Sequence, residues 1–240
     1  MPGYQTQQTQ VAIAGTAPLL IRCLLDRQQF SDPLGAAARL GISSAAWPMF
    51  GLLWPSGAHL AAHVAAYLAA DVLQPGQRFL EVGCGLALAS LVGHRRGADM
   101  TASDCHPLTE TFLAANLQLN HLPPMKYRHG EWDATRPTGL QAEESVSGRY
   151  DIIMGSDVLY DRDASTALAG FIGRHAMPAS EVWIVDPERG NRPAFSRLMA
   201  DIGYALEEVR LDGKAGADAP AYKGRLLCYR RPRPQRSRVI

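Results

Sequence analysis

The feature that most constrains this chain is the segment at positions 78–87, Arg-Phe-Leu-Glu-Val-Gly-Cys-Gly-Leu-Ala. Its run 79–82 is apolar except for one acid and predicts a buried strand. Gly83 and Gly85 follow where that strand must turn tightly into a helix that starts near Leu86. Because glycine has no Cβ, bare backbone and the N–H groups that open the helix can approach a ligand here. The segment therefore predicts an α/β unit with a binding loop at a strand end.

The spacing of the glycines separates two classes of ligand. A dinucleotide fingerprint, G-x-G-x-x-G, needs a third glycine at the position that Leu88 occupies here. The pattern is instead Glu-x-Gly-x-Gly-x-Ala, beginning at Glu81 in the strand end and closing at Ala87. A purely structural turn remains the alternative interpretation of these glycines.

This pattern resembles motif I of the class I S-adenosylmethionine-dependent methyltransferases, with Ala87 in place of the last glycine of that family. The resemblance implies a Rossmann-like α/β fold: a mostly parallel seven-stranded sheet with an antiparallel last strand and helices on both faces. It also implies S-adenosylmethionine as cofactor and S-adenosylhomocysteine as product. Glu81, Gly83, Cys84 and Gly85 would then belong to the cofactor site.

A second strand is expected over 98–103, and it ends at Asp104, 23 residues beyond Glu81. A nucleotide-binding βαβ unit places an acid at this point, where it accepts hydrogen bonds from the ribose hydroxyls. Asp104 and the adjacent Cys105 are therefore expected in the cofactor site. A cap for the next helix, expected over 108–120, is the alternative role for Asp104.

A third strand is expected over 125–129, shortly before Trp132 and Asp133. In class I methyltransferases a carboxylate just after this strand receives the adenine amine, and an apolar neighbour covers the ring. The resemblance assigns these roles to Asp133 and Trp132, since an indole offers a stacking face and an acid a specific acceptor. A surface turn is the alternative.

A fourth strand is expected over 152–155, and Ser156-Asp157-Val158-Leu159-Tyr160 follows it. This segment resembles the D-x-x-Y motif of the protein-lysine methyltransferase group that includes the lysine methyltransferase of electron-transfer flavoprotein β. Related DNA and protein-amide methyltransferases carry two prolines inside this motif, where this chain has Val158 and Leu159. The difference argues against an amide or base-amine acceptor. Asp157 and Tyr160 are expected to be catalytic and Ser156 to contact the cofactor, with plain turn residues as the alternative.

An aromatic segment precedes the glycine loop. Its part Leu-Trp-Pro-Ser-Gly, at 53–57, resembles the "W-P" segment of the same group, in which the Trp lies near the methionine end of the cofactor. Trp54 is accordingly expected in the cofactor site, although a core position is the alternative. An Ala-rich helix should follow to about Ala70, with Ser56 as its N-cap.

The remaining periodicity predicts helices at 164–175 and 192–202 and strands at 181–185, 204–211 and 222–230, the last two forming a hairpin. We therefore expect one methyltransferase domain over 47–230, preceded by an extension at 1–46 and followed by a basic tail at 231–240. The tail region 229–240 holds five arginines and no acid.

Composition excludes several functions. The net charge of +1 gives no global sign of nucleic-acid binding, and the longest apolar run, 60–70, is too short to span a bilayer. The first ten residues lack a secretory signal, and the four cysteines are too widely spaced for C-x-x-C pairs. We therefore expect a cytoplasmic protein with free thiols. His59 and His63 lack a third ligand, so no metal site is expected.

These patterns together predict an N-methyltransferase that acts on a lysine side chain of a protein substrate. Asp157 would hold and orient the amine, while Tyr160 and Trp54 would wall the reacting centre. Two alternatives remain: a methyltransferase for a small-molecule amine of the nicotinamide type, and a non-catalytic binding module that keeps the fold. Patterns in the chain leave the oligomeric state and the acceptor open.

Overall fold

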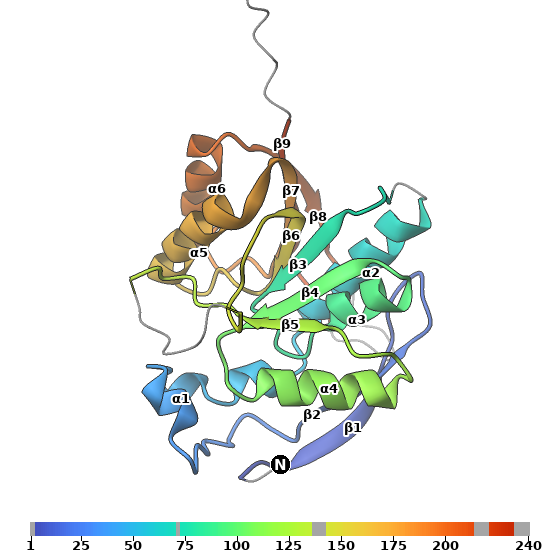
Figure 1. Cartoon of the computed structure of the whole chain (residues 1–240), viewed down its shortest axis with the longest axis vertical. Helices are drawn as coiled ribbons and strands as arrows, with labels where there is room; N and C mark the ends of the chain where they lie inside the picture. The colour runs from blue at the N-terminus through green and yellow to red at the C-terminus, as the bar shows by residue number, and fades with distance from the viewer. Residues whose placement is uncertain (1–2, 71–72, 136–142, 214–220, 233–240) are drawn as a thin grey trace, which may run out of the picture.

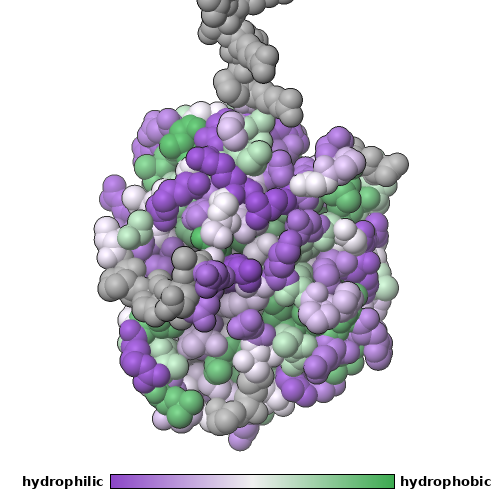
Figure 2. All heavy atoms as spheres, viewed as in Figure 1, coloured by the Kyte–Doolittle hydropathy of each residue, from purple (hydrophilic) through white to green (hydrophobic). Residues whose placement is uncertain are grey.

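The structure is a computed structural model that describes residues 3–70, 73–135, 143–213 and 221–232. It confirms the expected α/β fold, in which helices cover both faces of one seven-stranded sheet (Figure 1). Most of the basic tail expected at 231–240 lies outside the described residues. The face of the molecule seen in Figure 2 carries hydrophilic side chains around smaller apolar patches.

The sheet has the strand order β5-β4-β3-β6-β7-β9-β8. Its strands are β3 (Arg78–Val82), β4 (Asp99–Asp104), β5 (Lys126–His129), β6 (Tyr150–Ser156), β7 (Ala176–Asp186), β8 (Ala205–Arg210) and β9 (Arg225–Arg231). The first five pair in parallel, whereas β9 pairs antiparallel with both β7 and β8. The predicted C-terminal hairpin and antiparallel last strand are thereby confirmed.

The helices α2 (Pro55–Ala69), α3 (Leu88–Arg95), α4 (Thr109–Leu119), α5 (Arg162–His175) and α6 (Arg192–Asp201) form the two outer layers. The short helix α1 (Ala36–Arg39) and the 3-10 turns η1 (Ser44–Ala46) and η2 (Met49–Gly51) precede them in the chain. Side chains of α2, α3 and α4 pack in one buried cluster and those of α5 and α6 in a second. The two clusters lie on opposite faces of the sheet.

Alternation along the strands builds both cores. In β3, Phe79 belongs to the cluster under α2 and α3, and Leu80 belongs to the cluster under α5 and α6. In β7, Trp183 and Ile184 divide in the same way. Successive side chains of a strand point to opposite faces, so a sheet covered on both sides needs apolar residues at nearly every position. This explains why the central strands appear in the sequence as continuous apolar runs.

The order of the strands reverses at β3: the chain adds β4 and β5 on one side of β3 and then crosses over to add β6 on the other side. In open α/β sheets, ligands bind outside the carboxyl ends of the strands at such a reversal. Gly83 follows β3 directly and Asp157 follows β6 directly. The fold therefore brings the two most informative sequence motifs to one edge of the sheet.

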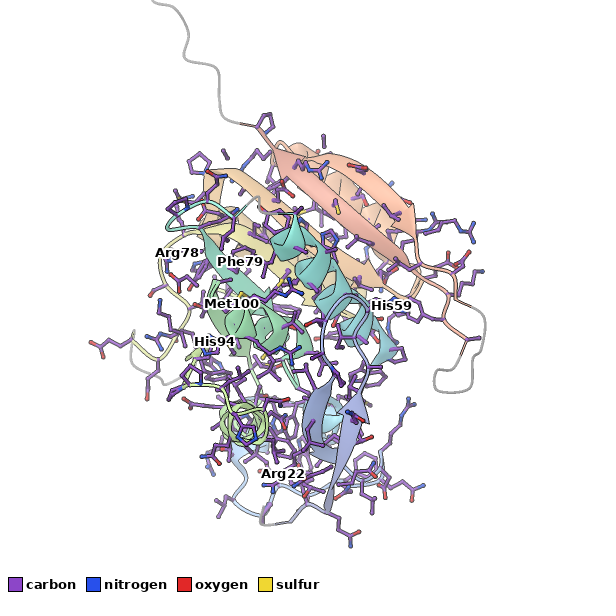
Figure 3. The ribbon with its side chains drawn as sticks, turned by 90° about the vertical axis from the view of Figure 1, so that its right-hand side faces the viewer. Arg22, His59, Arg78, Phe79, His94 and Met100 are labelled. Atoms are coloured by element: carbon purple, nitrogen blue, oxygen red, sulfur yellow. The ribbon has the colours of Figure 1, made fainter. Side chains whose placement is uncertain are left out.

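The N-terminal extension forms a separate antiparallel hairpin of β1 (Thr6–Val11) and β2 (Leu19–Leu24). Strand β2 lies against α4, and Figure 3 shows Arg22 in this lower part of the molecule. The side-chain oxygen of Asn116 accepts from the Arg22 N–H at 2.7 Å, and that of Asn120 accepts from the Leu20 N–H at 3.0 Å. Two amides of one helix thus bind the backbone of a strand almost a hundred residues earlier.

Two expected helix starts differ from the structure. Ser56 is not an N-cap, because α2 begins at Pro55 and Trp54 is its N-cap residue; the Ser56 hydroxyl instead bonds the Tyr222 hydroxyl at 2.9 Å. The helix expected from Leu86 begins at Leu88. The delay has a backbone cause, since φ of Ala87 is 57° and a left-handed residue cannot continue a right-handed helix.

Candidate active site

The glycine loop is fixed by its backbone. Gly83 and Gly85 have φ values of 56° and 50°, a region that favours glycine. A Cβ on Gly85 would lie 2.9 Å from the carbonyl oxygen of Phe50, so η2 rests directly on the loop. The Cys84 N–H also donates to the Ser103 oxygen at 3.0 Å, which ties the loop to β4. The loop is thus a preformed turn and has room for little more than hydrogen at Gly85.

Glu81 lies beneath this loop. Its side chain is 2% exposed, and its Oε2 accepts the backbone N–H of Ser90 at 2.7 Å, in the first turn of α3. Burial raises the pKa of Glu81 to about 7, and the nearby charge of Asp104 adds to the shift. The carboxyl group therefore satisfies one of the open N–H groups of α3 and supports the loop from below. The direct contact with a cofactor that the motif implies for Glu81 stays a prediction.

Asp104 bonds the loop from the side of β4. Its Oδ2 accepts from the Gly85 N–H and its Oδ1 from the His106 N–H, each at 2.9 Å. The side chain caps no helix, because the N-cap residue of α4 is Leu108 and no side chain bonds there. Burial raises the pKa of Asp104. Each carboxylate oxygen keeps lone-pair capacity, so ribose hydroxyls could still donate to it.

Sequence reasoning missed the contribution of the segment before Trp54 to this loop. The ring of Phe50 stacks on that of His106 with centroids 3.8 Å apart and planes 9° apart. Burial lowers the pKa of His106 to about 4, so the imidazole is neutral in the folded protein at neutral pH. The signal in the sequence was the aromatic, Pro- and Gly-broken stretch 47–57, which predicts no regular element but does predict a buried turn.

Trp132 and Asp133 have different surroundings. A Cβ on Gly83 would lie 3.4 Å from the ring of Trp132, so the indole lies against the glycine loop. Asp133 is exposed, and its Oδ1 accepts from the N–H and hydroxyl of Thr135 at 2.9 and 2.7 Å. The structure therefore places the Trp132 ring against the loop, while the Asp133 carboxylate bonds Thr135 in its own turn.

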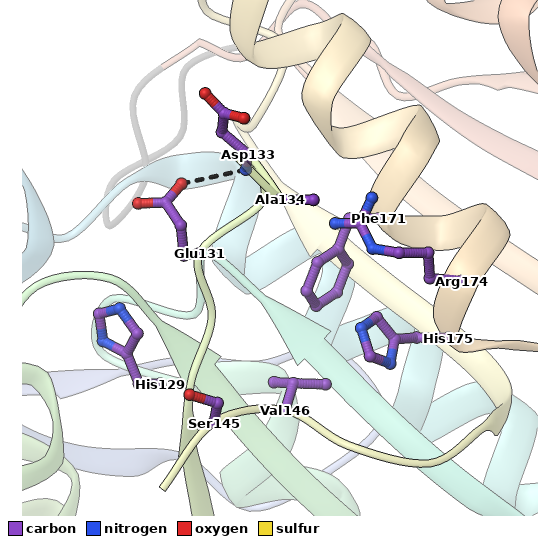
Figure 4. Close-up of a pocket in the computed structure, with 9 residues that line it drawn as sticks. All are labelled: His129, Glu131, Asp133, Ala134, Ser145, Val146, Phe171, Arg174 and His175. Carbon is purple, nitrogen blue, oxygen red and sulfur yellow. Dashed lines mark hydrogen bonds between the residues drawn. The ribbon is translucent and has the colours of Figure 1, made fainter. Parts of the chain in front are cut away.

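Asp133 lines a pocket on the side of the β5–β6 connection (Figure 4). Its walls also include the imidazoles of His129 and His175, the carboxylate of Glu131 and the guanidinium of Arg174. The Asp133 N–H donates to Glu131 at 3.1 Å, the dashed line in Figure 4. The wall of the pocket therefore combines charged groups of both signs with apolar side chains such as Phe171 and Val146, and Trp132 is not part of it.

Asp157 follows β6 in a left-handed conformation, with φ of 59°, and its N–H donates to the Val185 oxygen at 2.8 Å. Its carboxylate is engaged by Arg189, a residue that sequence reasoning did not single out. The guanidinium donates from Nη2 to Oδ2 at 2.9 Å and from Nε to Oδ1. The pair joins the loop after β6 to the loop after β7. Tyr160, the other expected catalytic residue, follows in the same loop and is 57% exposed.

Trp54 is half-buried at the start of α2 and is not a core residue. Its Nε1 donates to the Met49 oxygen at 3.0 Å, and two guanidinium carbons lie near its ring, Arg27 at 5.1 Å and Arg189 at 6.0 Å from the centroid. Ser156 faces the same helix, since a Cβ on Gly57 would lie 3.7 Å from its hydroxyl. Arg189 thus links Trp54 to Asp157 at the carboxyl end of β6, and Ser156 lies against α2 at the same strand end.

The helix α2 also faces the C-terminal hairpin. His59, labelled in Figure 3, packs on Tyr222 with ring centroids 4.1 Å apart. His63, one turn further, meets Trp183 edge to face at 4.6 Å. Both imidazoles are thus packing groups. No set of three or more metal-ligating side chains occurs within the part of the chain that the structure describes.

The expected free thiols are confirmed at all four cysteines. Cys84 is buried in the glycine loop, where burial and the charges of Asp104 and Glu81 raise its pKa well above the ordinary value. Cys105 is exposed beside Asp104. Cys84 therefore lies in the loop as the neutral thiol, whereas Cys105 directly follows Asp104, the acid that bonds the loop. Of the described helices, none has the length and apolar character that crossing a membrane requires.

The strand order, the glycine loop and the acid that ends β4 define a Rossmann-like methyltransferase fold. Solved structures of this class are similar: magnesium protoporphyrin IX methyltransferase from Synechocystis with bound SAM has a TM-score of 0.55 at 18% identity over 73% of this chain and 79% of its own. A methyltransferase from Pyrococcus furiosus has a TM-score of 0.52 at 17% identity, covering 70% of this chain and 82% of its own. At such identities the likeness concerns the fold alone.

The family is narrower than the fold. A model of the lysine methyltransferase family matches residues 48–200, well over half of the chain, and the chain belongs to this family. Protein N-lysine methyltransferase METTL21A of Danio rerio is 33% identical over 39% of this chain and 41% of its own length. The Mus musculus protein of that name is 26% identical over 55% of this chain and 60% of its own. The chain thus matches less than two thirds of the length of these relatives.

Proposed function

We propose that this protein transfers a methyl group from S-adenosylmethionine to the amine of a lysine side chain in a protein. The observation that carries the proposal is the meeting of three motifs at Gly83. A Cβ there would lie 3.0 Å from Val158 of the D-x-x-Y segment and 3.4 Å from the ring of Trp132. Membership of the lysine methyltransferase family and the two METTL21A relatives support the same acceptor class.

The residues at the loop fit this cofactor. The left-handed Gly83 and Gly85 present backbone without side chains, as a ligand at the loop needs. Asp104 would receive the ribose hydroxyls with the lone pairs that Gly85 and His106 leave free, and Trp132 would cover the adenine. Glu81 would act through the loop that it supports. Bound here, S-adenosylmethionine supplies an electrophilic methyl group.

The acceptor would approach from the side of Asp157. Displacement at a methyl group is in-line and needs little acid–base chemistry, so orientation of the amine can supply ~7 kcal/mol or more of the barrier reduction. A lysine ammonium must lose its proton before it can attack, and a carboxylate oxygen can hold the N–H groups while the lone pair turns to the methyl group. Trp54 and Tyr160 would wall this position, because an indole or phenol face attracts a cation.

We further propose that this reaction takes place in the cytoplasm. The support is chemical: Cys84 and Cys105 are thiols at the centre of the site, and thiols persist in reducing compartments. Cell fractionation followed by immunodetection tests this placement. Recovery of the protein from an oxidising compartment would contradict it.

The central experiment incubates the protein with methyl-labelled S-adenosylmethionine and a cell lysate, and then locates the label by gel and by mass spectrometry. We expect a labelled protein band that carries methylated lysine. Label only in the small-molecule fraction would favour a metabolite amine as acceptor. Absence of cofactor binding by calorimetry would instead favour a non-catalytic module.

The Asp157→Asn variant tests the acceptor side. It keeps the shape of the side chain but removes the negative charge that would attract and orient the amine. We therefore expect the methylation rate to fall roughly 10²-fold, the scale of a positioned proton-handling group. Cofactor affinity should remain nearly unchanged. Asp163→Asn, an exposed acid at the start of α5, is the matched control. Equal losses of cofactor binding and methylation in Asp157→Asn would place Asp157 in the cofactor site instead.

A further inference from the structure

The carboxylate expected to receive the acceptor amine already holds a cation. Both oxygens of Asp157 accept from the guanidinium of Arg189, which is the bidentate geometry of strong Arg–carboxylate pairs. The Asp157 side chain is only 9% exposed, whereas that of Arg189 is 38% exposed. An incoming ammonium would therefore meet the Arg189 side chain before it reached Asp157.

An aromatic ring also lies beside the Arg189 guanidinium, in addition to the Asp157 carboxylate. The guanidinium carbon of Arg189 lies 6.0 Å from the ring centroid of Trp54, within the range of a cation–π contact. A carboxylate on one side and an indole on the other form a subsite for a cation at the end of a long side chain. Arginine and lysine both have that shape, and Arg189 fills the subsite from within the chain.

We infer that Arg189 is an internal stand-in for the acceptor: it occupies the Asp157–Trp54 subsite, and a substrate lysine must displace it. The identity of the acceptor rests on the proposed function, but the occupancy of the subsite by a displaceable cation does not. Arg189 thereby becomes a specificity-determining residue. Neutral or short acceptors cannot compete for both Asp157 and Trp54, so the internal cation excludes them.

A displaced guanidinium needs a new anion. The acid before it in the sequence, Glu188, is engaged by Lys223 at 3.1 Å and Arg225 at 3.4 Å. Asp186, two residues further back, is fully buried at the end of β7. Neither of these two acids offers an accessible, unpaired carboxylate. A carboxylate beside the target lysine of the acceptor protein could instead receive Arg189 as the lysine takes its place. The preferred target is therefore a lysine with an acidic neighbour.

Calorimetry with ethylguanidinium and n-butylammonium as probes, at constant ionic strength, tests the occupancy. Arg189→Ala should bind both probes at least about tenfold more tightly than the wild type, the scale of one hydrogen bond to a charged group. Adding Asp157→Asn to this variant should remove the gain. Arg192→Ala, a nearby arginine paired with Glu208, is the matched control and should behave as the wild type. Equal probe affinity in Arg189→Ala and the wild type would overturn the inference.

Arg189→Gln serves as a second variant if Arg189→Ala unfolds, because it keeps more of the side-chain volume. Short peptides with one lysine flanked by glutamate or by glutamine test the preference. We expect the wild type to methylate the glutamate peptide about tenfold faster at low concentration and the Arg189 variants to lose that preference. An unchanged preference would refute the role of Arg189 in specificity. Probe binding without any lysine methylation would sink the proposed function and leave the occupied subsite standing.

Discussion

The buried carboxyl group of Glu81 should make the stability of this protein depend on pH in a direction unusual for an acid. Its pKa rises from the ordinary 4.5 to about 7 on folding. Between these two values the folded state keeps a proton that the unfolded state has lost, so the free energy of unfolding falls as pH rises. One pKa unit corresponds to 1.36 kcal/mol, so the loss from pH 4.5 to 7 is about 3 kcal/mol.

His106 opposes this slope. Burial lowers its pKa from 6.5 to about 4, so the unfolded state binds the extra proton between those values. The free energy of unfolding then rises with pH, by about 3 kcal/mol from pH 4 to 6.5. In the wild type the two contributions nearly cancel between pH 4.5 and 6.5. The titration of Glu81 is therefore visible only as a difference between variants.

Glu81→Gln removes one titration and keeps an oxygen that can accept the Ser90 N–H. From pH 4.5 to 7 we expect the free energy of unfolding of this variant to rise by about 3 kcal/mol relative to the wild type. Urea denaturation followed by circular dichroism at half-unit pH steps measures this. For His106→Gln the free energy of unfolding should instead fall relative to the wild type as pH rises from 4 to 6.5. Parallel curves for Glu81→Gln and the wild type would refute a raised pKa at Glu81.

Three further outcomes follow from the site and the N-terminal hairpin. Asp104→Asn should raise the dissociation constant of S-adenosylmethionine tenfold or more, since hydrogen bonds to a charged group contribute about 1.5–3 kcal/mol; unchanged calorimetric affinity would remove Asp104 from the ribose site. Gly85→Ala should lower the free energy of unfolding, measured by urea denaturation, by about 1–2 kcal/mol for the left-handed backbone. The loss should exceed this value, because the added Cβ also collides with the carbonyl oxygen of Phe50. Asn116→Ala should cost about 1–3 kcal/mol and speed amide exchange in β2, more than Asn120→Ala, which is less buried; equal exchange would argue against this anchor.

Most of the fold could be predicted from local patterns. Apolar runs and glycines mark β3 and β6 within one or two residues, because a strand covered on both faces must be apolar nearly throughout. The helix starts were less accurate. Ala87 has no sequence signal for its left-handed backbone, and the hydroxyl of Ser56 found a partner, Tyr222, far along the chain.

The parts of the site that were missed depend on pairs distant in sequence. Arg189 meets Asp157 because the parallel β6 and β7 end at the same edge of the sheet, 32 residues apart along the chain. Phe50 meets Gly85 because η2 rests on the glycine loop. Motifs describe one segment at a time, so they predict each loop but not which charged group will face which across the crevice.

The position of Glu81 shows what strand parity could have added. Side chains two apart in a strand share a face, so Glu81 must point to the same side as Phe79, which packs under α2 and α3. The chain leaves β3 directly into α3 and returns to the parallel β4, so α3 covers that face by a right-handed crossover. An acid on this face at the strand end meets the open N–H groups of the helix before it can meet a ligand. Asp104 lies two residues after Ala102 in β4 and so points to this same face of the sheet. At the end of β4, however, the neighbour is the glycine loop and not a helix. The two acids of the nucleotide-binding pattern thus have different partners: Glu81 accepts from the first turn of α3, and Asp104 accepts from the Gly85 N–H of the loop. In the function proposed above, the remaining lone pairs of Asp104 would receive the ribose hydroxyls.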